Sequence, residues 1–361
     1  MPLPDHNALA RLRLAHIPWL GPLTQRALVE RFGSAAAVFD AGEEIETFAG
    51  PHVALAVSRG PDPALIERAL RWAQLDGHHL IAYEEDRYPS LLREITAAPG
   101  ILYATGDIER LRRQAVAVVG ARNATPQGVR DAEALACALS QSGVCIVSGL
   151  ALGIDAAAHR GGLAGPGSTV AVMGTGADIH YPRRNRDLAL RIESEGCIIT
   201  EFALGTPPIS GNFPRRNRLI SGLARAVLVV EANEKSGSLV TARCALEQDR
   251  AVLAVPGSIH SPLSKGCHKL IKEGATLVES AADVQAELGM ARDEPDIVPA
   301  DPREPDAFLE ALGEAPATLD QIAIRTGLAA PAISVRLSRL QIEGTICELP
   351  GGRYQRIARA R

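Results

Sequence analysis

The sequence of 361 residues lacks the motifs of two large classes of nucleotide-binding protein. It contains no G-x-x-x-x-G-K-[ST] segment, which P-loop nucleotide hydrolases use to hold phosphates. It also contains no G-x-G-x-x-G, and the second apolar run of the central region ends in "VSG" rather than in an acidic residue, so a nicotinamide cofactor is disfavoured. We therefore expect the protein to work without a cofactor.

Closely spaced cysteines and long apolar runs are absent as well. The chain has six scattered cysteines and no C-x-x-C pair, so we expect reduced thiols rather than disulfides or metal ligands. No run approaches the roughly 18 apolar residues of a membrane span. The opening "MPLPDHNALARLRL" does not follow the charged-then-apolar pattern of a signal peptide. The sequence therefore predicts a cytoplasmic protein with no metal and no membrane partner.

Lysine is missing from a long central stretch that is rich in arginine. Between Arg110 and Val230 there are fourteen arginines, no lysine and eight acidic residues, although the whole chain has a formal net charge of −4. Arginine suits bidentate contacts with phosphate and stacking on bases, which indicates an anionic partner. A high genomic GC content also favours arginine, so composition leaves both explanations open and the positions of the arginines must decide.

Six short apolar runs recur through the middle of the chain, and a helical pattern follows each of them. Runs that are apolar without alternation predict strands buried on both faces, hence a parallel sheet with helices above and below. The fold class that we expect is α/β, a doubly wound, mostly parallel Rossmann-like sheet, with residues 78–86 and 101–107 adding edge structure. The six runs are residues 115–121, 144–151, 169–177, 196–203, 226–233 and 251–258.

The chain divides into four segments by pattern. Residues 1–72 predict a small helical domain whose "LGP" turn resembles a helix-hairpin-helix or SAM-like unit, and both a DNA contact and a purely structural cap stay open for it. Residues 73–290 predict the Rossmann-like domain, and residues 291–306 an acidic, proline-rich linker. Residues 307–361 predict a winged helix, a module that binds DNA in some proteins and protein in others.

On such a sheet the ligand binds at the loops that follow the strands. Glycine-rich backbone at helix starts, together with hydroxyl and cationic side chains, favours phosphate there. Several such loops on one edge of a basic segment predict a polyanionic ligand. The candidate residues are Gly120, Ala121 and Arg122, then Ser148, Gly149 and Gly153, then Ser236, Gly237, Ser238 and Lys265.

An acid and a histidine follow the second strand. Asp155 and His159 lie about one helical turn apart in "SGLALGIDAAAH", a spacing that a catalytic pair could use. No serine or cysteine nucleophile is placed beside them by any motif. We therefore favour a structural interpretation, in which Asp155 caps the helix and His159 is a satisfied core histidine.

Two hexapeptides share one ring, three arginines and an asparagine: "YPRRNR" at 181–186 and "FPRRNR" at 213–218, after the third and fourth strands. An aromatic ring stacks on an unpaired base for roughly 1–3 kcal/mol, so ring and arginine together fit single-stranded DNA better than duplex. We predict that 181–186 mainly starts a helix, with its ring in the core, and that 213–218 carries the site at the exposed start of a helix, beside the arginine of the first loop. The second hexapeptide contributes Phe213, Arg215, Arg216, Asn217 and Arg218.

In their order along the chain, these segments resemble the DNA-processing protein family DprA (Smf). The resemblance rests on "VAVVGARNATPQG", "SGLALGIDAAAH", "TVAVMGTGADIHYPRRN", "ITEFALGTPPISGNFPRRNRLISGL", "VVEANEKSGSLVTA" and "AVPGSIHSPLSKGCHKLIKEGA", which cover roughly residues 80–290. It implies a non-enzymatic protein that binds and protects incoming single-stranded DNA during natural transformation in competent cells. It also implies a homodimer that helps load the RecA recombinase in DNA recombination.

Two of the family's functional positions carry over to this sequence by motif. The phosphate-gripping arginine falls on Arg122, and the basic cluster falls on the arginines of 213–218. Ala121 stands where the family usually has serine, which removes one hydroxyl donor, and His268 stands where it often has asparagine. Both changes concern local detail of the site.

Two alternatives from other classes stay open. Rossmann-like proteins of the LOG group hydrolyse nucleoside monophosphates with a P-G-G-x-G-T-x-x-E motif; here the comparable loop reads "EKSGSLVTA", and the next acidic residue, Glu247, comes too late to fit. A winged-helix regulator with a Rossmann sensor domain would carry a small-molecule fingerprint, which this sequence lacks.

Overall fold

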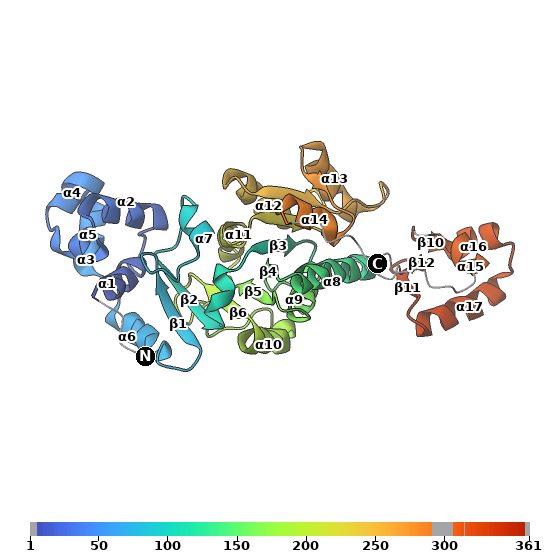
Figure 1. Cartoon of the computed structure of the whole chain (residues 1–361), viewed down its shortest axis with the longest axis horizontal. Coiled ribbons are helices and arrows are strands. Elements are labelled where there is room, and N and C mark those ends of the chain that lie inside the picture. Colours follow the sequence, from blue (N-terminus) through green and yellow to red (C-terminus); the bar gives the residue numbers. More distant parts are fainter. Residues whose placement is uncertain (1–5, 291–305, 314, 358–361) are drawn as a thin grey trace.

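The computed structural model describes residues 6–290, 306–313 and 315–357 (Figure 1). Within them, nine strands form one sheet in the order β1-β2-β6-β5-β4-β3-β7-β8-β9. The sheet occupies the middle of the molecule, with a helical unit at one end and the winged helix at the other (Figure 1). The strands are β1 (His78–Ala82), β2 (Ile101–Gly106), β3 (Ala115–Val119), β4 (Cys145–Ser148), β5 (Thr169–Val172), β6 (Cys197–Thr200), β7 (Ala226–Val229), β8 (Ala251–Ala254) and β9 (Thr276–Leu277).

The six apolar runs form the parallel strands β3 to β8, as predicted. Strands β1 and β2 pair antiparallel at one edge, and β2 joins them to β6. The short strand β9, which the sequence did not predict, extends the other edge in parallel with β8. From β3 the chain winds outward to β4, β5 and β6, and then returns to the other side of β3 as β7. Loops after β3 and β7 therefore face each other at a reversal of strand order, where open α/β sheets bind ligands.

Helices cover both faces of the sheet, and every residue of the central strand β3 is therefore buried. Ala117 and Val119 pack with buried residues of α11, α12 and α13, whereas Val116 and Val118 pack with those of α8 and α9. The helices around the sheet are α7 (Ser90–Glu94), α8 (Pro126–Gln141), α9 (Ile154–Leu163), α10 (Arg186–Glu195), α11 (Asn212–Gly222), α12 (Ser238–Glu247), α13 (Lys265–Lys272) and α14 (Ala281–Glu287).

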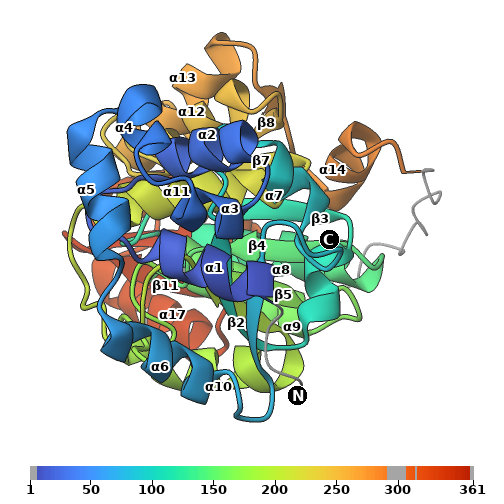
Figure 2. The ribbon, with the colours of Figure 1, turned by 90° about the vertical axis from the view of Figure 1, so that its left-hand side faces the viewer.

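The N-terminal unit consists of short helices, seen end-on in Figure 2; α1 to α5 surround a small core of their own, whereas α6 packs with β1 and β2. As predicted, Gly33 ends one helix with a positive φ of 88°, and the Ser34 side chain caps the next by accepting from the amide of Ala37. The helices are α1 (His6–Ala15), α2 (Pro22–Phe32), α3 (Ala35–Asp40), α4 (Glu44–Ala49), α5 (Pro51–Arg59) and α6 (Pro63–Trp72).

The C-terminal unit is a winged helix, as predicted. Its recognition-type helix α17 carries Arg336 and Arg339, and both are paired within the unit, with Asp306 and Glu343 respectively. The predicted linker 291–306, apart from its last residue, lies outside the described residues. The elements are α15 (Ala307–Leu312), β10 (Ala317–Thr318), α16 (Leu319–Thr326), α17 (Ala330–Ile342), β11 (Ile346–Leu349) and β12 (Arg353–Arg356).

None of the helices formed by the described residues combines the length and the apolar character needed to cross a bilayer. Three short 3-10 turns complete the secondary structure of those residues: η1 (Ile108–Arg112), η2 (Arg183–Asn185) and η3 (Pro262–Ser264).

Candidate nucleic-acid interface

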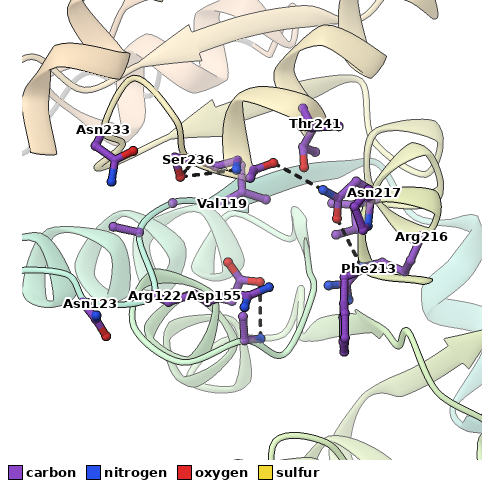
Figure 3. Close-up of a pocket in the computed structure, with 18 of the residues that line it drawn as sticks. Val119, Arg122, Asn123, Asp155, Phe213, Arg216, Asn217, Asn233, Ser236 and Thr241 are labelled. Atoms are coloured by element: carbon purple, nitrogen blue, oxygen red, sulfur yellow. Dashed lines mark hydrogen bonds between the residues drawn. The ribbon is translucent and has the colours of Figure 1, made fainter. Parts of the chain in front are cut away.

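A cavity of about 650 Å³ opens where the sheet order reverses (Figure 3). Its walls come mainly from the loops after β3 and β7 and from the first turns of α11 and α12, with further residues from the segments that follow β4, β5 and β6. Nine of the predicted site residues line it: Gly120, Ala121, Arg122, Phe213, Arg216, Asn217, Ser236, Gly237 and Ser238.

Six predicted site residues do not line the cavity. Ser148 is buried, and its hydroxyl donates to the carbonyl of Val118, so it ties β4 to β3. Gly153 has a φ of 77° and lies so close to the Ala121 carbonyl that a Cβ would meet it at 2.3 Å. Ser148 and Gly153 therefore fix the backbone around the cavity and do not face its interior. The other four are Gly149, Arg215, Arg218 and Lys265.

Arg122 projects from the loop after β3 and is exposed, with no ion pair to any described residue. Its guanidinium lies 5.8 Å from the centre of the Phe213 ring. The sequence suggested that the start of the helix behind this loop is available to phosphate. In the structure it is occupied, because the Glu231 carboxylate accepts from the amide and hydroxyl of Thr125, the N-cap of α8. Arg122 rather than the α8 dipole therefore supplies the positive charge of this wall.

The second hexapeptide lies inside α11 and does not precede it, since the helix begins at Asn212. Arg216 is buried at 4% exposure and is not at the exposed end of the helix, which corrects the prediction. One of its Nη atoms donates to the carbonyls of Gly149 (2.7 Å) and Val172. Gly149 is covered by this guanidinium, because a Cβ there would lie 2.7 Å from it. The helical twist turns the second arginine of the hexapeptide into the protein, where it holds the loop after β4.

Arg216 is balanced by a buried acid, Asp155. The Asp155 carboxylate accepts from the amides of Gly149 (3.1 Å) and Ala151 (3.4 Å), while Gly153 rather than Asp155 is the N-cap residue of α9. Burial raises the pKa of Asp155, and Arg216 opposes that rise. Burial likewise lowers the pKa of Arg216 to about 10, and Asp155 opposes that fall. Asp155 and Arg216 therefore stabilise each other's charged form at the cavity wall.

His159 is a core histidine, as predicted. It is fully buried, its Nε2 accepts from the amide of Leu150, and its Nδ1 lies 2.7 Å from the hydroxyl of Thr169. Burial, reinforced by the charge of Arg216, lowers its pKa to about 3. His159 does not line the cavity, whereas Asp155 does, and both side chains bind amides of the loop after β4.

The outer arginines of the second hexapeptide converge on Glu201, which follows β6. Arg218 makes two contacts with this carboxylate, at 2.6 and 2.7 Å, and donates to the carbonyl of Ala97. Arg215 contacts the same carboxylate at 3.3 Å and lies 5.3 Å from the centre of the Phe202 ring. Much of the positive charge that the hexapeptide suggests is therefore neutralised inside the protein.

The first hexapeptide presents its ring and its arginines to solvent. Tyr181 is 41% exposed and lines the cavity, so the prediction that its ring lies in the core is wrong. Its ring centre lies 5.5 Å from that of Phe213, and the two form one pair at the cavity mouth. Arg183, Arg184 and Arg186 are exposed, without an ion pair to any described residue. The predicted helix does start in this hexapeptide, as α10, whose first residue is Arg186.

The asparagines of the two hexapeptides both donate hydrogen bonds to loop carbonyls. Asn185 is buried and donates to the carbonyls of Leu150 (2.8 Å) and Ala151 (3.1 Å). Asn217 donates to the carbonyl of Gly237 at 3.3 Å. Each asparagine therefore fixes a loop at the cavity.

The wall opposite Arg122 is the start of α12. The hydroxyls of Ser236 and Ser238 lie 2.7 Å apart and line the cavity, while the amides of Leu239 and Val240 donate to the carbonyls of Ser236 and Gly237. Asn233 and Thr241 also line this wall and were missed, because neither stands in a glycine-rich or basic stretch. Lys265 is exposed at the start of α13 and lies outside the lining.

Comparison with protein families gives two matches along the chain. Residues 79–289 match the family described as DNA recombination-mediator protein A, and residues 292–352 match the DprA winged helix domain. Together they span most of the sequence.

Individual relatives agree with these matches. Protein Smf of Escherichia coli is 42% identical over 306 residues, which is 82% of this chain and 82% of that protein. The crystal structure of DNA processing protein A from Streptococcus pneumoniae superposes with a TM-score of 0.68 at 36% identity, covering 77% of this chain and 97% of the other. A Helicobacter pylori DNA processing protein A, described for its single-stranded DNA binding mode, superposes with a TM-score of 0.54 at 29% identity, covering 60% and 97%.

Proposed function

Since this chain belongs to the DNA recombination-mediator protein A (DprA/Smf) family, we propose that it binds single-stranded DNA across the cavity and the arginines beside it. The observation that carries the proposal is the group at the cavity mouth. There the rings of Tyr181 and Phe213 lie 5.5 Å apart, and Arg122 lies against one of them. Bases and phosphates of one strand need these two kinds of group side by side.

The unpaired arginines give the strand a direction beyond the cavity. Arg183, Arg184 and Arg186 adjoin Tyr181 and keep their full charge, whereas Arg215 and Arg218 share Glu201. We propose that phosphates contact Arg122 and the start of α12 inside the cavity, and then this exposed trio outside it. Arg216, Ser148, Gly149 and Gly153 support the site from within.

The rings favour single strands over duplex. In a duplex the bases already stack on one another, so an exposed ring gains nothing from them, whereas an unpaired base can stack on it. Phe213 has no hydrogen-bonding group, and both hexapeptide asparagines are engaged with carbonyls, so the hydroxyl of Tyr181 is the one polar group that the two rings could offer to a base edge. We therefore propose binding without strong sequence preference.

The role is that of a binding protein rather than an enzyme. His159 is used inside the protein, and among the described residues no cluster of histidine, cysteine and acidic side chains could hold a metal ion. A nucleoside-monophosphate hydrolase of the LOG type remains the competing function, and the experiment below includes its substrate.

Two partners enter the proposal beside DNA. Loading of the RecA recombinase during natural transformation is proposed from the family relationship alone. A homodimer is likewise proposed from the family relationship. The end of the sheet at β9, where Leu277 is 45% exposed, is a candidate surface, because a free strand edge favours pairing with another chain.

We also propose the domain division 1–72, 73–290 and 307–361 around the linker 291–306. A chain ending near Met290 keeps the whole cavity, since every lining residue precedes it. It should fold and still bind single strands. Loss of all binding in a folded truncated chain would place part of the site in the winged helix.

The experiment compares a labelled oligothymidine, the matching duplex and a nucleoside monophosphate over a salt series. We expect the single strand to bind best, with log affinity falling linearly with log salt through counterion release. Arg122→Ala should flatten that slope by about one unit. The matched control is Arg225→Ala. This exposed arginine immediately precedes β7, so it lies at the amino ends of the parallel strands, whereas the cavity lies at their carboxyl ends. Equal affinity for duplex and single strand, or turnover of the monophosphate, would refute the proposal.

A further inference from the structure

We infer that Glu201 restrains the affinity of the site, because it competes with DNA phosphate for Arg215. The inference rests on the proposed function and concerns the regulation of that same site. It starts from the unequal way in which one carboxylate holds two arginines.

Glu201 follows β6, and its side chain is only 3% exposed. A carboxylate taken out of water in this way needs a close cationic partner. Arg218 meets that need by itself, with two nitrogens at 2.6 and 2.7 Å from the two carboxylate oxygens. It is also anchored to the backbone carbonyls of Ala97 and Arg215, at 3.1 and 2.7 Å. Arg218 is therefore a fixed part of the protein.

Arg215 is held much more loosely. Its contacts with Glu201 are both 3.3 Å, and its side chain is 51% exposed against 15% for Arg218. If Arg215 moved away from Glu201, the buried carboxylate would still be paired with Arg218. Arg215 itself would then be hydrated, and a guanidinium in water needs no partner. Of the two arginines, only Arg215 can exchange its carboxylate for another anion.

The position of Arg215 indicates that a DNA phosphate is the anion that could replace Glu201. It is in the first turn of α11, directly between Pro214 and Arg216, both of which line the cavity. Its guanidinium lies outside the cavity lining, 5.3 Å from the centre of the Phe202 ring, and half of the side chain is exposed. A strand that leaves the cavity along the first turn of α11 would meet Arg215 there. Every phosphate contact that Arg215 makes must first displace Glu201, so the carboxylate lowers the affinity for DNA.

The test uses Glu201→Gln in the full chain. The exchange keeps the shape of the side chain and removes its charge, so Arg215 is released. We expect tighter binding of a labelled oligothymidine, by about two- to fivefold at low salt, the range of a partly exposed ion pair. The gain should vanish at high salt. Removing any acidic residue lowers repulsion of DNA, so Glu195→Gln, which breaks the exposed pair with Arg191, is the matched control and should change little.

Two further variants separate competition from simple disruption. Arg218→Gln breaks the same pair as Glu201→Gln but leaves Glu201 to Arg215 alone. It should weaken binding, although both variants should lower the melting temperature. Glu201→Gln combined with Arg215→Ala should bind no more tightly than Arg215→Ala alone. The inference is supported if Glu201→Gln raises the affinity for DNA while Arg218→Gln lowers it, and if Glu201→Gln gives no gain in affinity in the Arg215→Ala background.

The inference fails if folded Glu201→Gln binds no better than the parent chain, or if its gain survives in the Arg215→Ala background. Failure of the proposed function looks different, because the parent chain itself would then show no preference for single strands. The two outcomes are read from different samples in the same salt series.

Discussion

The two hexapeptides of this chain have nearly the same sequence and opposite surroundings. In 181–186 the ring and three arginines face solvent and only Asn185 is buried. In 213–218 one arginine is buried against carbonyls and two share Glu201. The difference comes from the helix. The first hexapeptide forms the 3-10 turn η2 and only its last residue belongs to α10, whereas the second lies inside α11, where the twist sends successive side chains to different sides. A basic motif therefore does not define a basic surface.

The largest expected effect separates Arg216 from its counterpart Arg184. Arg216→Ala leaves Asp155 buried without its cation, which costs about 3–5 kcal/mol in the free energy of unfolding. Arg184→Ala removes an exposed, unpaired side chain and should change that free energy by about 0.5 kcal/mol or less. Denaturant titration measures both. Similar stability for the two variants would mean that Arg216 is no more structural than Arg184.

A pH effect tests the loop that both hexapeptides hold. Asn185, Arg216 and His159 all bind the loop after β4. The pKa of His159 is lowered from 6.5 to about 3 in the folded protein. Below pH 6.5 the unfolded chain therefore takes up a proton that the folded chain refuses, and stability falls as the pH falls towards 3. The loss should reach about 1.4 kcal/mol per pH unit for this one group.

The control for the pH effect is His159→Gln, which keeps a donor and an acceptor but does not titrate. We expect the free energy of unfolding of this variant to fall less steeply than that of the parent chain between pH 6.5 and 4. Parallel curves would show that His159 is protonated in the folded protein.

The smallest of the three effects concerns DNA affinity. Arg183→Ala with Arg184→Ala removes two free cations, so the salt slope should fall by about two units and binding should weaken by about tenfold or more at 0.1 M salt. Arg215→Ala should change the slope by less than about one unit, because Glu201 already neutralises part of that charge. This ranking reverses the one that the sequence suggested. A gel-shift salt series measures it, and an unchanged slope in the double variant would restore the original ranking.

The sequence predicted the parts of the fold that depend on neighbours along the chain. Uninterrupted apolar runs marked strands β3 to β8, because burial on both faces leaves no room for polar residues. Gly33 and Ser34 marked a helix end and a helix start through backbone conformation and capping. These signals are local, and the structure agrees with them.

The burial of Arg216 could not be predicted in that way. Its partners Gly149, Asp155 and Val172 come from the loop after β4, from α9 and from the end of β5, and only the folded sheet brings them to α11. Tyr181 was misplaced for the same reason. Its neighbour Phe213 lies on a different strand-helix connection, so the ring pair exists only at the shared edge of the sheet.

The reversal of strand order also fixes when the site can exist during synthesis. β3 finds β4 soon after both are made, but its other neighbour, β7, is translated roughly a hundred residues later. At about 5–20 residues per second, one side of β3 stays unpaired for roughly 5–20 s on the ribosome. The cavity is complete only after Ser238, Thr241 and finally Leu263 have also emerged, since all three line it. A nascent chain therefore carries its arginines for several seconds before it has a site in which to use them.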